Sequence, residues 1–231
     1  FFLSDAQTYL GRIKVLDIRL SQDFIEKAEA QFTLLEESMI RSRMIHRNDF
    51  AHKGQMGNAL IVAGSYGMAG ASILATQACL RSGVGKVTVH TPKKNYSIMQ
   101  ISVPEAVMQM DHEETTFSEA VDTEDFDALG IGPGLGQVEN TAIAMITQIR
   151  RAQCPVVADA DALNMLANHR AWMQQLPKNI ILTPHPLEFD RLSGSPANSD
   201  YERLQQAREM AQNLHAFIIL KGHYSALCMP N

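Results

Sequence analysis

The sequence has little cysteine, and what it has follows no recognised spacing. Its 231 residues include three cysteines, and none of them forms a CxxC pair. Such a count is typical of proteins in a reducing compartment. The eight histidines show no HExxH or other paired metal spacing, and no GxSxG nucleophile motif occurs. These absences argue against zinc and serine-hydrolase chemistry.

Long apolar runs and an excess of positive charge are also missing. The best apolar run, residues 59–63, has the length of a buried strand and falls far short of the roughly 18 residues of a membrane span. No basic segment followed by an apolar block marks an export signal. Twenty Lys and Arg against 25 Asp and Glu give a net charge of −5, while apolar residues reach 45%. We therefore expect a cytoplasmic globular protein that binds neither nucleic acid nor membrane.

Glycine is present in clusters. Of 14 glycines, seven fall between Gly54 and Gly85 and four between Gly130 and Gly136. Clustering of this kind indicates two places where the backbone approaches something closely or adopts a positive φ.

Apolar runs alternate with helical patterns between and after these clusters. The sequence predicts strands over 58–63, 86–90, 127–130, 155–159, 179–182 and 217–221, the start of a hairpin at 225–229, and helices over 69–82, 139–151 and 199–215. Buried strands that alternate with helices favour an α/β fold, with a largely parallel sheet covered by helices on both faces.

The first fifty residues follow a different pattern. Residues 14–18 predict an isolated strand, and the charged stretch 23–44 predicts mostly helix. We interpret residues 1–21 as the remnant of a preceding domain, 22–49 as a connector and 50–231 as the main domain. The chain lacks an initiator Met and stops inside the expected hairpin, so we expect a polypeptide cut at both ends.

Five polar or glycine-rich segments follow predicted strands, where open parallel sheets bind their ligands. The segments 64–71 and 130–136 offer backbone N–H groups to an anionic or flat ligand. Neither matches a P-loop or a GxGxxG fingerprint, and tight helix packing alone also explains the first of them.

The other three segments carry charged or titratable side chains. Asp159 and Asp161 have the chemistry to orient a hydroxyl or hold a hydrated metal ion, although helix N-capping explains one of them equally well. His185 lies between two prolines, with Glu188 in the first turn of a predicted helix. Lys221 ends an apolar strand beside a glycine, which suits a phosphate but also an ordinary strand terminus.

Taken in order, the segments resemble a known family. HKGQMGNALIVAGSYGMAGAS, GIGPGLG, DADALN, LTPHPLEF and LKGHYS are similar to the ADP- or ATP-dependent NAD(P)H-hydrate dehydratases, which have a ribokinase-like fold. The resemblance covers residues 50–231. The stretch LGRIKVLDIRLS resembles the end of the NAD(P)H-hydrate epimerase domain that precedes the dehydratase in bifunctional bacterial proteins.

The resemblance implies a repair reaction catalysed by a carbon–oxygen lyase. NADH hydrate or NADPH hydrate is dehydrated while ADP, or ATP, is consumed with Mg²⁺. The implied mechanism transfers a phosphoryl group to the ring hydroxyl and then eliminates phosphate, a far better leaving group than hydroxide. Relatives are commonly homo-oligomers, so we expect the same here.

Residue roles follow from the resemblance position by position. It implies that Ala71, Gly134 and His185 contact the hydrate, and it gives Glu188 a role at Mg²⁺. The implied nucleotide-binding residues form one run: Lys221, Gly222, His223, Tyr224 and Ser225.

Two departures from the family pattern stand out. Leu187 replaces a usual glycine, and the GTGD-type motif, whose Asp is the expected base on the reacting hydroxyl, would lie beyond Asn231. A chain that ends there is expected to be inactive. Two alternatives stay open: a sugar or vitamin kinase of the same fold, and an inactive nucleotide-binding fragment.

Overall fold

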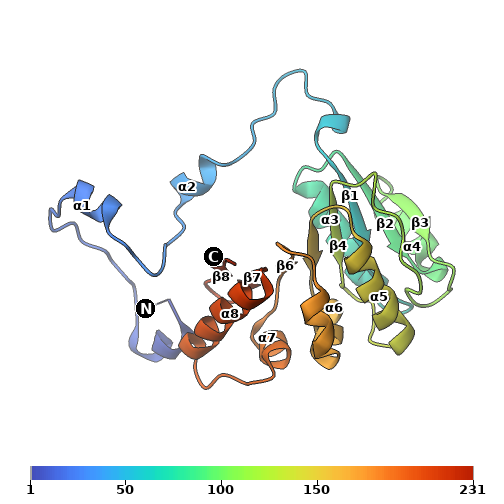
Figure 1. Ribbon diagram of the computed structural model, residues 1–231. Coiled ribbons are helices and arrows are strands. Elements are labelled where there is room, and N and C mark those ends of the chain that lie inside the picture. The colour runs from blue at the N-terminus through green and yellow to red at the C-terminus, as the bar shows by residue number, and fades with distance from the viewer. Residues whose placement is uncertain (1, 231) are drawn as a thin grey trace. The chain divides into compact units, whose positions relative to one another are not determined.

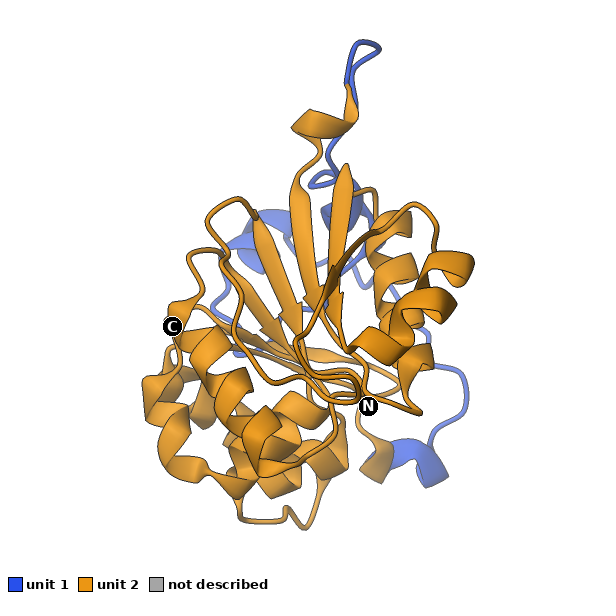
Figure 2. Ribbon diagram, turned by 90° about the vertical axis from the view of Figure 1, so that its right-hand side faces the viewer, with its two compact units in different colours: residues 1, 6–51 blue, residues 2–5, 52–231 orange. Residues whose placement is uncertain are grey.

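The computed structural model describes residues 2–230 and divides them into two compact units. Residues 6–51 form the N-terminal unit, and residues 2–5 with 52–230 form the C-terminal unit, as the two colours of Figure 2 show. Among the described residues, no helix combines the length and the apolar composition that crossing a membrane requires.

The N-terminal unit has little regular structure. It contains most of the 3₁₀ helix η1 (Ser4–Tyr9) and two short helices, α1 (Gln22–Lys27) and α2 (Glu37–Arg41), none with a buried residue. The predicted strand over 14–18 is wrong, because those residues have no strand partner and their apolar side chains are exposed. An isolated strand leaves its backbone groups unpaired and is not stable alone. The prediction of mostly helix over 23–44 is also wrong in extent, because only the short helices α1 and α2 form there.

The C-terminal unit is built on one sheet of eight strands in the described part of the chain. The order is β3-β2-β1-β4-β5-β6-β7-β8, and every pairing is parallel except that of β7 with β8. The strands are β1 (Asn58–Val62), β2 (Lys86–Thr91), β3 (Val107–Met110), β4 (Ala128–Ile131), β5 (Val156–Ala158), β6 (Ile181–Leu182), β7 (Phe217–Leu220) and β8 (Ala226–Cys228).

Helices cover both faces of this sheet. The α-helices are α3 (Ala69–Arg81), α4 (Tyr96–Ser102), α5 (Glu139–Arg151), α6 (Asp161–Asn168), α7 (Pro186–Ser193) and α8 (Asp200–Leu214), and the 3₁₀ helices are η2 (Lys53–Gln55), η3 (Lys93–Asn95) and η4 (Arg170–Gln175). Figure 1 shows α5 to α8 side by side along the sheet, with α3 beside β1 and β2 and α4 beside β3.

Alternate residues of β1 pack into two different apolar cores, one on each face of the sheet. Leu60 and Val62 belong to the large apolar core that includes residues of α5 to α8. Ile61 belongs to a second core that includes Met99 of α4 and residues of α3. Successive side chains of a strand point to opposite faces, so a continuous apolar run is what a strand buried on both faces needs. The predicted α/β class and parallel sheet are confirmed.

Candidate functional site

The strand order reverses between β1 and β4. From β1 the chain adds β2 and β3 on one side, and then returns to place β4 on the other side. Loops that follow the two strands at such a reversal diverge and leave a ligand crevice at the carboxyl edge of the sheet. Both predicted glycine segments, 64–71 and 130–136, lie at this reversal.

These two segments touch each other. The Gly64 N–H donates to the carbonyl of Pro133 at 2.8 Å. A Cβ on Gly134 would lie 2.7 Å from the Cβ of Ala71 and 3.1 Å from the carbonyl oxygen of Met68. Gly134 also has a φ of +67°, a conformation that glycine adopts without strain. The structure therefore brings Ala71 and Gly134, both predicted substrate residues, into direct contact.

The loop after β5 packs against the loop after β4. A Cβ on Gly132 would lie 1.8 Å from the carbonyl oxygen of Asp159. The Asp161 carboxylate accepts a bond from the Gly136 N–H at 2.9 Å and another from the side chain of Gln137 at 3.2 Å. Asp161 thus fixes the end of the glycine segment.

The capping explanation for Asp159 and Asp161 is wrong. Ala160 occupies the N-cap of α6, and no side chain caps that helix. Instead, the Asp159 carboxylate accepts from the Ala160 N–H and from Lys221. Ala160 itself has φ 52° and ψ −118°, a conformation that an L-residue rarely adopts. Backbone strain of this kind is concentrated at functional sites.

Ala160→Gly is expected to raise the free energy of unfolding by about 1 kcal/mol. Relief of about 1–3 kcal/mol of strain exceeds the 0.5–1 kcal/mol that glycine's extra freedom costs. Urea unfolding measures the difference, and Ala167→Gly in α6 serves as a control that should lose about 1 kcal/mol. Equal losses in the two variants would show that Ala160 is not strained.

His185 and Glu188 hold each other at the start of α7. The His185 Nδ1 accepts from the backbone N–H groups of Leu187 and Glu188, at 3.2 and 3.3 Å. Glu188 accepts in return from the His185 N–H at 2.8 Å, which completes a capping box with Pro186 in the first turn. The imidazole is 44% exposed while the Glu188 carboxylate is 8% exposed. The ring is therefore held in one orientation at the sheet edge.

Lys221 joins three of the loops. Its Nζ donates to Asp159 at 2.8 Å and lies 3.9 Å from Glu188, and its backbone N–H donates to the carbonyl of Pro184 at 2.9 Å. Residues 222–225 follow as an exposed turn before β8. One ammonium group beside two carboxylates, an imidazole and glycine-loop backbone suits a ligand with phosphate groups and hydroxyls.

Sequence reasoning missed an anchored loop at the end of β3. The buried Asp111 accepts from His90 at 3.1 Å, from the N–H groups of Ser118 and Glu113 at 2.8 Å each, and from the Ser118 hydroxyl. The loop that it anchors reaches the site, because the Tyr66 N–H donates to the carbonyl of Thr115 at 2.8 Å. The local signal for β3 was weak, because Val107–Met110 is a four-residue run of exposed and half-buried side chains.

Hydrogen bonding outweighs burial at this carboxylate. Burial alone would raise the pKa of Asp111, but the bonds from His90, Ser118 and Glu113 favour its charged form. The pKa of Asp111 therefore lies well below the ordinary range of an aspartate.

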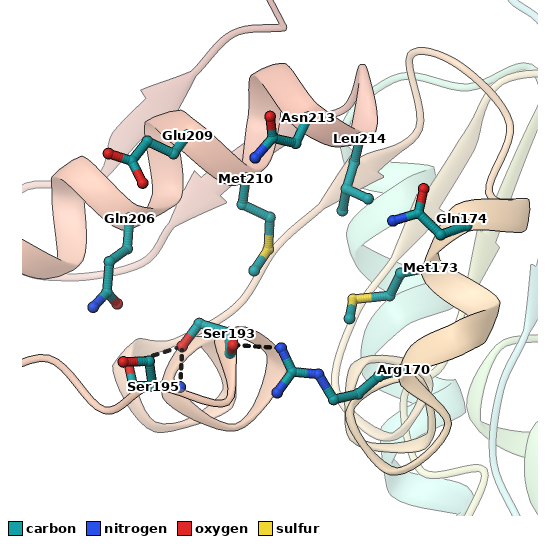
Figure 3. A pocket seen from close by; sticks show the side chains of 10 residues that line it. All are labelled: Arg170, Met173, Gln174, Ser193, Ser195, Gln206, Glu209, Met210, Asn213 and Leu214. Atoms are coloured by element: carbon teal, nitrogen blue, oxygen red, sulfur yellow. Dashed lines mark hydrogen bonds between the residues drawn. The ribbon is translucent and has the colours of Figure 1, made fainter.

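A hollow of about 470 Å³ lies elsewhere, among α7, α8 and η4 (Figure 3). Arg170, which donates to the carbonyl of Ser193, forms part of its wall. It adjoins the helix ends that lead into β6 and β7, away from the carboxyl edge, and it contains none of the predicted site residues. The described residues also contain no group of three or more His, Cys, Asp or Glu side chains arranged to hold a metal ion.

The fold is a ribokinase-like α/β fold. A ribokinase-like superfamily protein of Enterococcus faecalis superimposes with a TM-score of 0.73 at 23% identity, over 87% of this chain and 72% of that one. That likeness concerns the fold alone.

The family is shown by sequence. The model of the NAD(P)H-hydrate dehydratase family matches residues 59–231, and the chain belongs to this family. The ADP-dependent (S)-NAD(P)H-hydrate dehydratase of Bacillus subtilis is 36% identical over 84% of this chain and 68% of its own length. A crystal structure of the Bacillus subtilis ADP/ATP-dependent enzyme, co-crystallised with ATP and Mg²⁺, gives a TM-score of 0.71 at 33% identity, over 84% of this chain and 68% of that one.

A longer relative aligns over nearly the whole chain. The bifunctional NAD(P)H-hydrate repair enzyme of Moorella thermoacetica is 34% identical over 96% of this chain. The chain spans 43% of the length of that relative.

Proposed function

We propose that this chain binds hydrated NADH or NADPH beside ADP, and that it forms the dehydration site of a nicotinamide-coenzyme repair enzyme. One observation supports this most directly: residues from five loops, far apart in the sequence, lie in a connected row along one sheet edge. Ala71 contacts Gly134, Gly132 lies against Asp159, and Asp159 bonds Lys221. Lys221 in turn lies 3.9 Å from Glu188, which shares a capping box with His185.

The row divides into two ends with different chemistry. Ala71, half-buried and packed against the buried Gly134, offers an apolar surface that suits the flat ring of a nicotinamide. Lys221 and the turn 222–225 offer an ammonium group and backbone donors that suit nucleotide phosphates. His185 lies between them in strand order, because it follows β6, between β5 and β7. This order supports the hydrate and the nucleotide as neighbours.

The proposed reaction places a phosphoryl group on the ring hydroxyl and then eliminates phosphate. Phosphoryl transfer depends on positioning and on neutralising the charge of the moving group. Lys221 provides a positive charge at the nucleotide end.

Mg²⁺ is part of the proposal, and it would neutralise charge on the nucleotide phosphates. This ion is usually held by one or two carboxylates together with phosphates and waters. Glu188 and Asp159, the two carboxylates beside Lys221, supply that donor class. Glu188 is the residue that we expect to act.

The activity test incubates the complete gene product with NADH hydrate and ADP. Return of the reduced nicotinamide absorbance together with release of phosphate is the expected result. Phosphorylation of a sugar or a hydroxymethylpyrimidine without that return would instead favour a kinase of the same fold. ADP binding with neither activity would favour an inactive fragment.

His185 and Lys221 are expected to serve different ligands. Lys221→Ala should weaken ADP binding by about 10- to 100-fold, the value of a hydrogen bond to a charged group, and change hydrate binding little. His185→Asn should weaken hydrate binding by about tenfold while keeping a residue that caps α7 well. Isothermal titration measures both constants for each variant.

The control for these variants is Lys178→Ala. Lys178 is exposed and precedes β6, at the opposite edge of the sheet, so both constants should stay at their wild-type values. If His185→Asn weakened only ADP binding and Lys221→Ala only hydrate binding, the assignment of the two ends would be wrong.

We also propose that residues 1–21 belong to the end of an epimerase domain and that 22–49 connect it to the dehydratase domain. The Moorella relative, named as bifunctional, aligns over 96% of this chain and so across this region. This proposal explains why the N-terminal unit has no buried residue in its short helices α1 and α2.

A further inference from the structure

Tyr66 and Lys94 form an exposed aromatic–cationic pair that the proposed function does not use. The Lys94 Nζ lies 5.1 Å from the centroid of the Tyr66 ring, within the range of a cation–π interaction. The tyrosine is 66% exposed. Glu114 is the other charged neighbour of the ammonium group, at 3.5 Å. We call these two residues the Tyr66–Lys94 pair.

The backbone beneath this pair is firmly held. The Tyr66 N–H donates to Thr115 at 2.8 Å, and the Lys94 N–H donates to Glu114 at 3.0 Å. Both acceptors belong to the loop that the buried Asp111 anchors through His90, Glu113 and Ser118. Two exposed side chains on a base with this much hydrogen bonding are pre-positioned for a ligand rather than free to move with a loose loop.

The pair lies at one end of the row of loops. Along the carboxyl edge the strand order is β2, β1, β4, β5, β6 and β7, so Lys94 lies at one end and Lys221 at the other. Neighbouring strands are about 4.8 Å apart, which makes the row roughly 24 Å long. Met68, two residues from Tyr66, lines the close contact at Gly134. Met68 therefore connects the contact at Gly134 with Tyr66 along the loop after β1.

This order constrains how an elongated dinucleotide lies. If its nicotinamide end is at Gly134 and ADP is at Lys221, the rest of the molecule extends away from Lys221, toward β1 and β2. An adenine base stacks well on an aromatic ring, and a lysine is a suitable point charge for a phosphate. NADPH differs from NADH by a phosphate on the adenosine ribose, which is the group that a cation at this position would recognise.

We propose that the Tyr66–Lys94 pair binds the adenosine end of the hydrated dinucleotide, and that Lys94 favours NADPH hydrate over NADH hydrate. This inference rests on the proposed function. Tyr66 stacks on the base. Lys94 exchanges its contact with Glu114 for the 2′-phosphate of NADPH hydrate.

The test measures the Kd of NADPH hydrate and of NADH hydrate by isothermal titration. Lys94→Ala should raise the Kd of NADPH hydrate about tenfold and that of NADH hydrate less than about twofold. Tyr66→Ala should raise both values about tenfold, because both ligands carry the same adenine. Tyr66→Phe keeps the ring and should bind both hydrates nearly as the wild type does.

Lys86→Ala is the matched control, because Lys86 is exposed at the start of β2, and Lys94 lies in η3 just beyond the other end of that strand. Both constants should be unchanged in it. Equal effects of Lys94→Ala on the two hydrates, or no effect, would overturn the role of Lys94. Wild-type protein that binds neither hydrate would overturn the proposed function itself. Normal binding by the wild type that is unchanged in the Tyr66 and Lys94 variants would overturn only the present inference.

Discussion

Gly132→Ala is expected to lower the free energy of unfolding by about 4 kcal/mol, the sum of backbone strain and overpacking. Gly132 has a φ of +131°, where a residue with a Cβ is strained. Its Cβ would also lie 1.8 Å from the carbonyl oxygen of Asp159 and 2.9 Å from the Cβ of Ala162. Neither atom is the free end of a flexible side chain, so the loops after β4 and β5 would have to separate.

The same change should weaken nucleotide binding. Asp159 holds the Nζ of Lys221 at 2.8 Å, and displacement of the Asp159 backbone moves that carboxylate. Urea unfolding and ADP titration measure the two effects on one protein.

Gly70→Ala is the control for Gly132→Ala. Gly70 lies in α3 without a positive φ, and a Cβ there would meet nothing within 4 Å. Alanine should therefore stabilise α3 by up to about 1 kcal/mol. Wild-type stability in Gly132→Ala would contradict the close approach of the two loops.

Much of the fold could be predicted because local pattern and burial agree. The helix predicted over 139–151 coincides with α5, and the strand predicted over 58–63 with β1. The 13 residues of α5 are long enough for periodicity to indicate a helix, whereas β1 is marked by a short continuous apolar run followed by a glycine segment. The predicted hairpin at 225–229 is confirmed by β8, which pairs antiparallel with β7.

What could not be predicted depends on register and on pairings between distant residues. β3 has only four residues, whose side chains alternate between exposed and half-buried. The sequence therefore has no buried apolar run that would mark this strand. Asp111 and His90 are 21 residues apart, and Asp159 and Lys221 are 62 apart. Nothing in the local sequence of Asp159 distinguishes a helix cap from an ion pair. The glycine spacing predicted a close approach but not its partner.

Asp111→Asn is expected to lower the free energy of unfolding at pH 7 by about 3 kcal/mol. The change removes the charge of a fully buried carboxylate, and an amide cannot accept all the bonds that the carboxylate accepts from His90, Ser118 and Glu113. Because the anchored loop carries Thr115, which holds Tyr66, binding of NADPH hydrate should weaken as well. Urea unfolding across pH measures the first effect.

The pH dependence identifies the carboxylate as the cause. The pKa of Asp111 is lowered in the folded protein, so its stabilisation is present above the unfolded value, about 3.9, and is lost as the pH falls toward the folded value. The difference between wild type and Asp111→Asn should therefore shrink steadily below about pH 4, since asparagine does not titrate. The control Glu105→Gln, at an exposed position before β3, should stay within about 0.5 kcal/mol of wild type throughout. A difference that persisted unchanged into acid would mean that packing around Asp111, and not its charge, holds the loop beneath Tyr66.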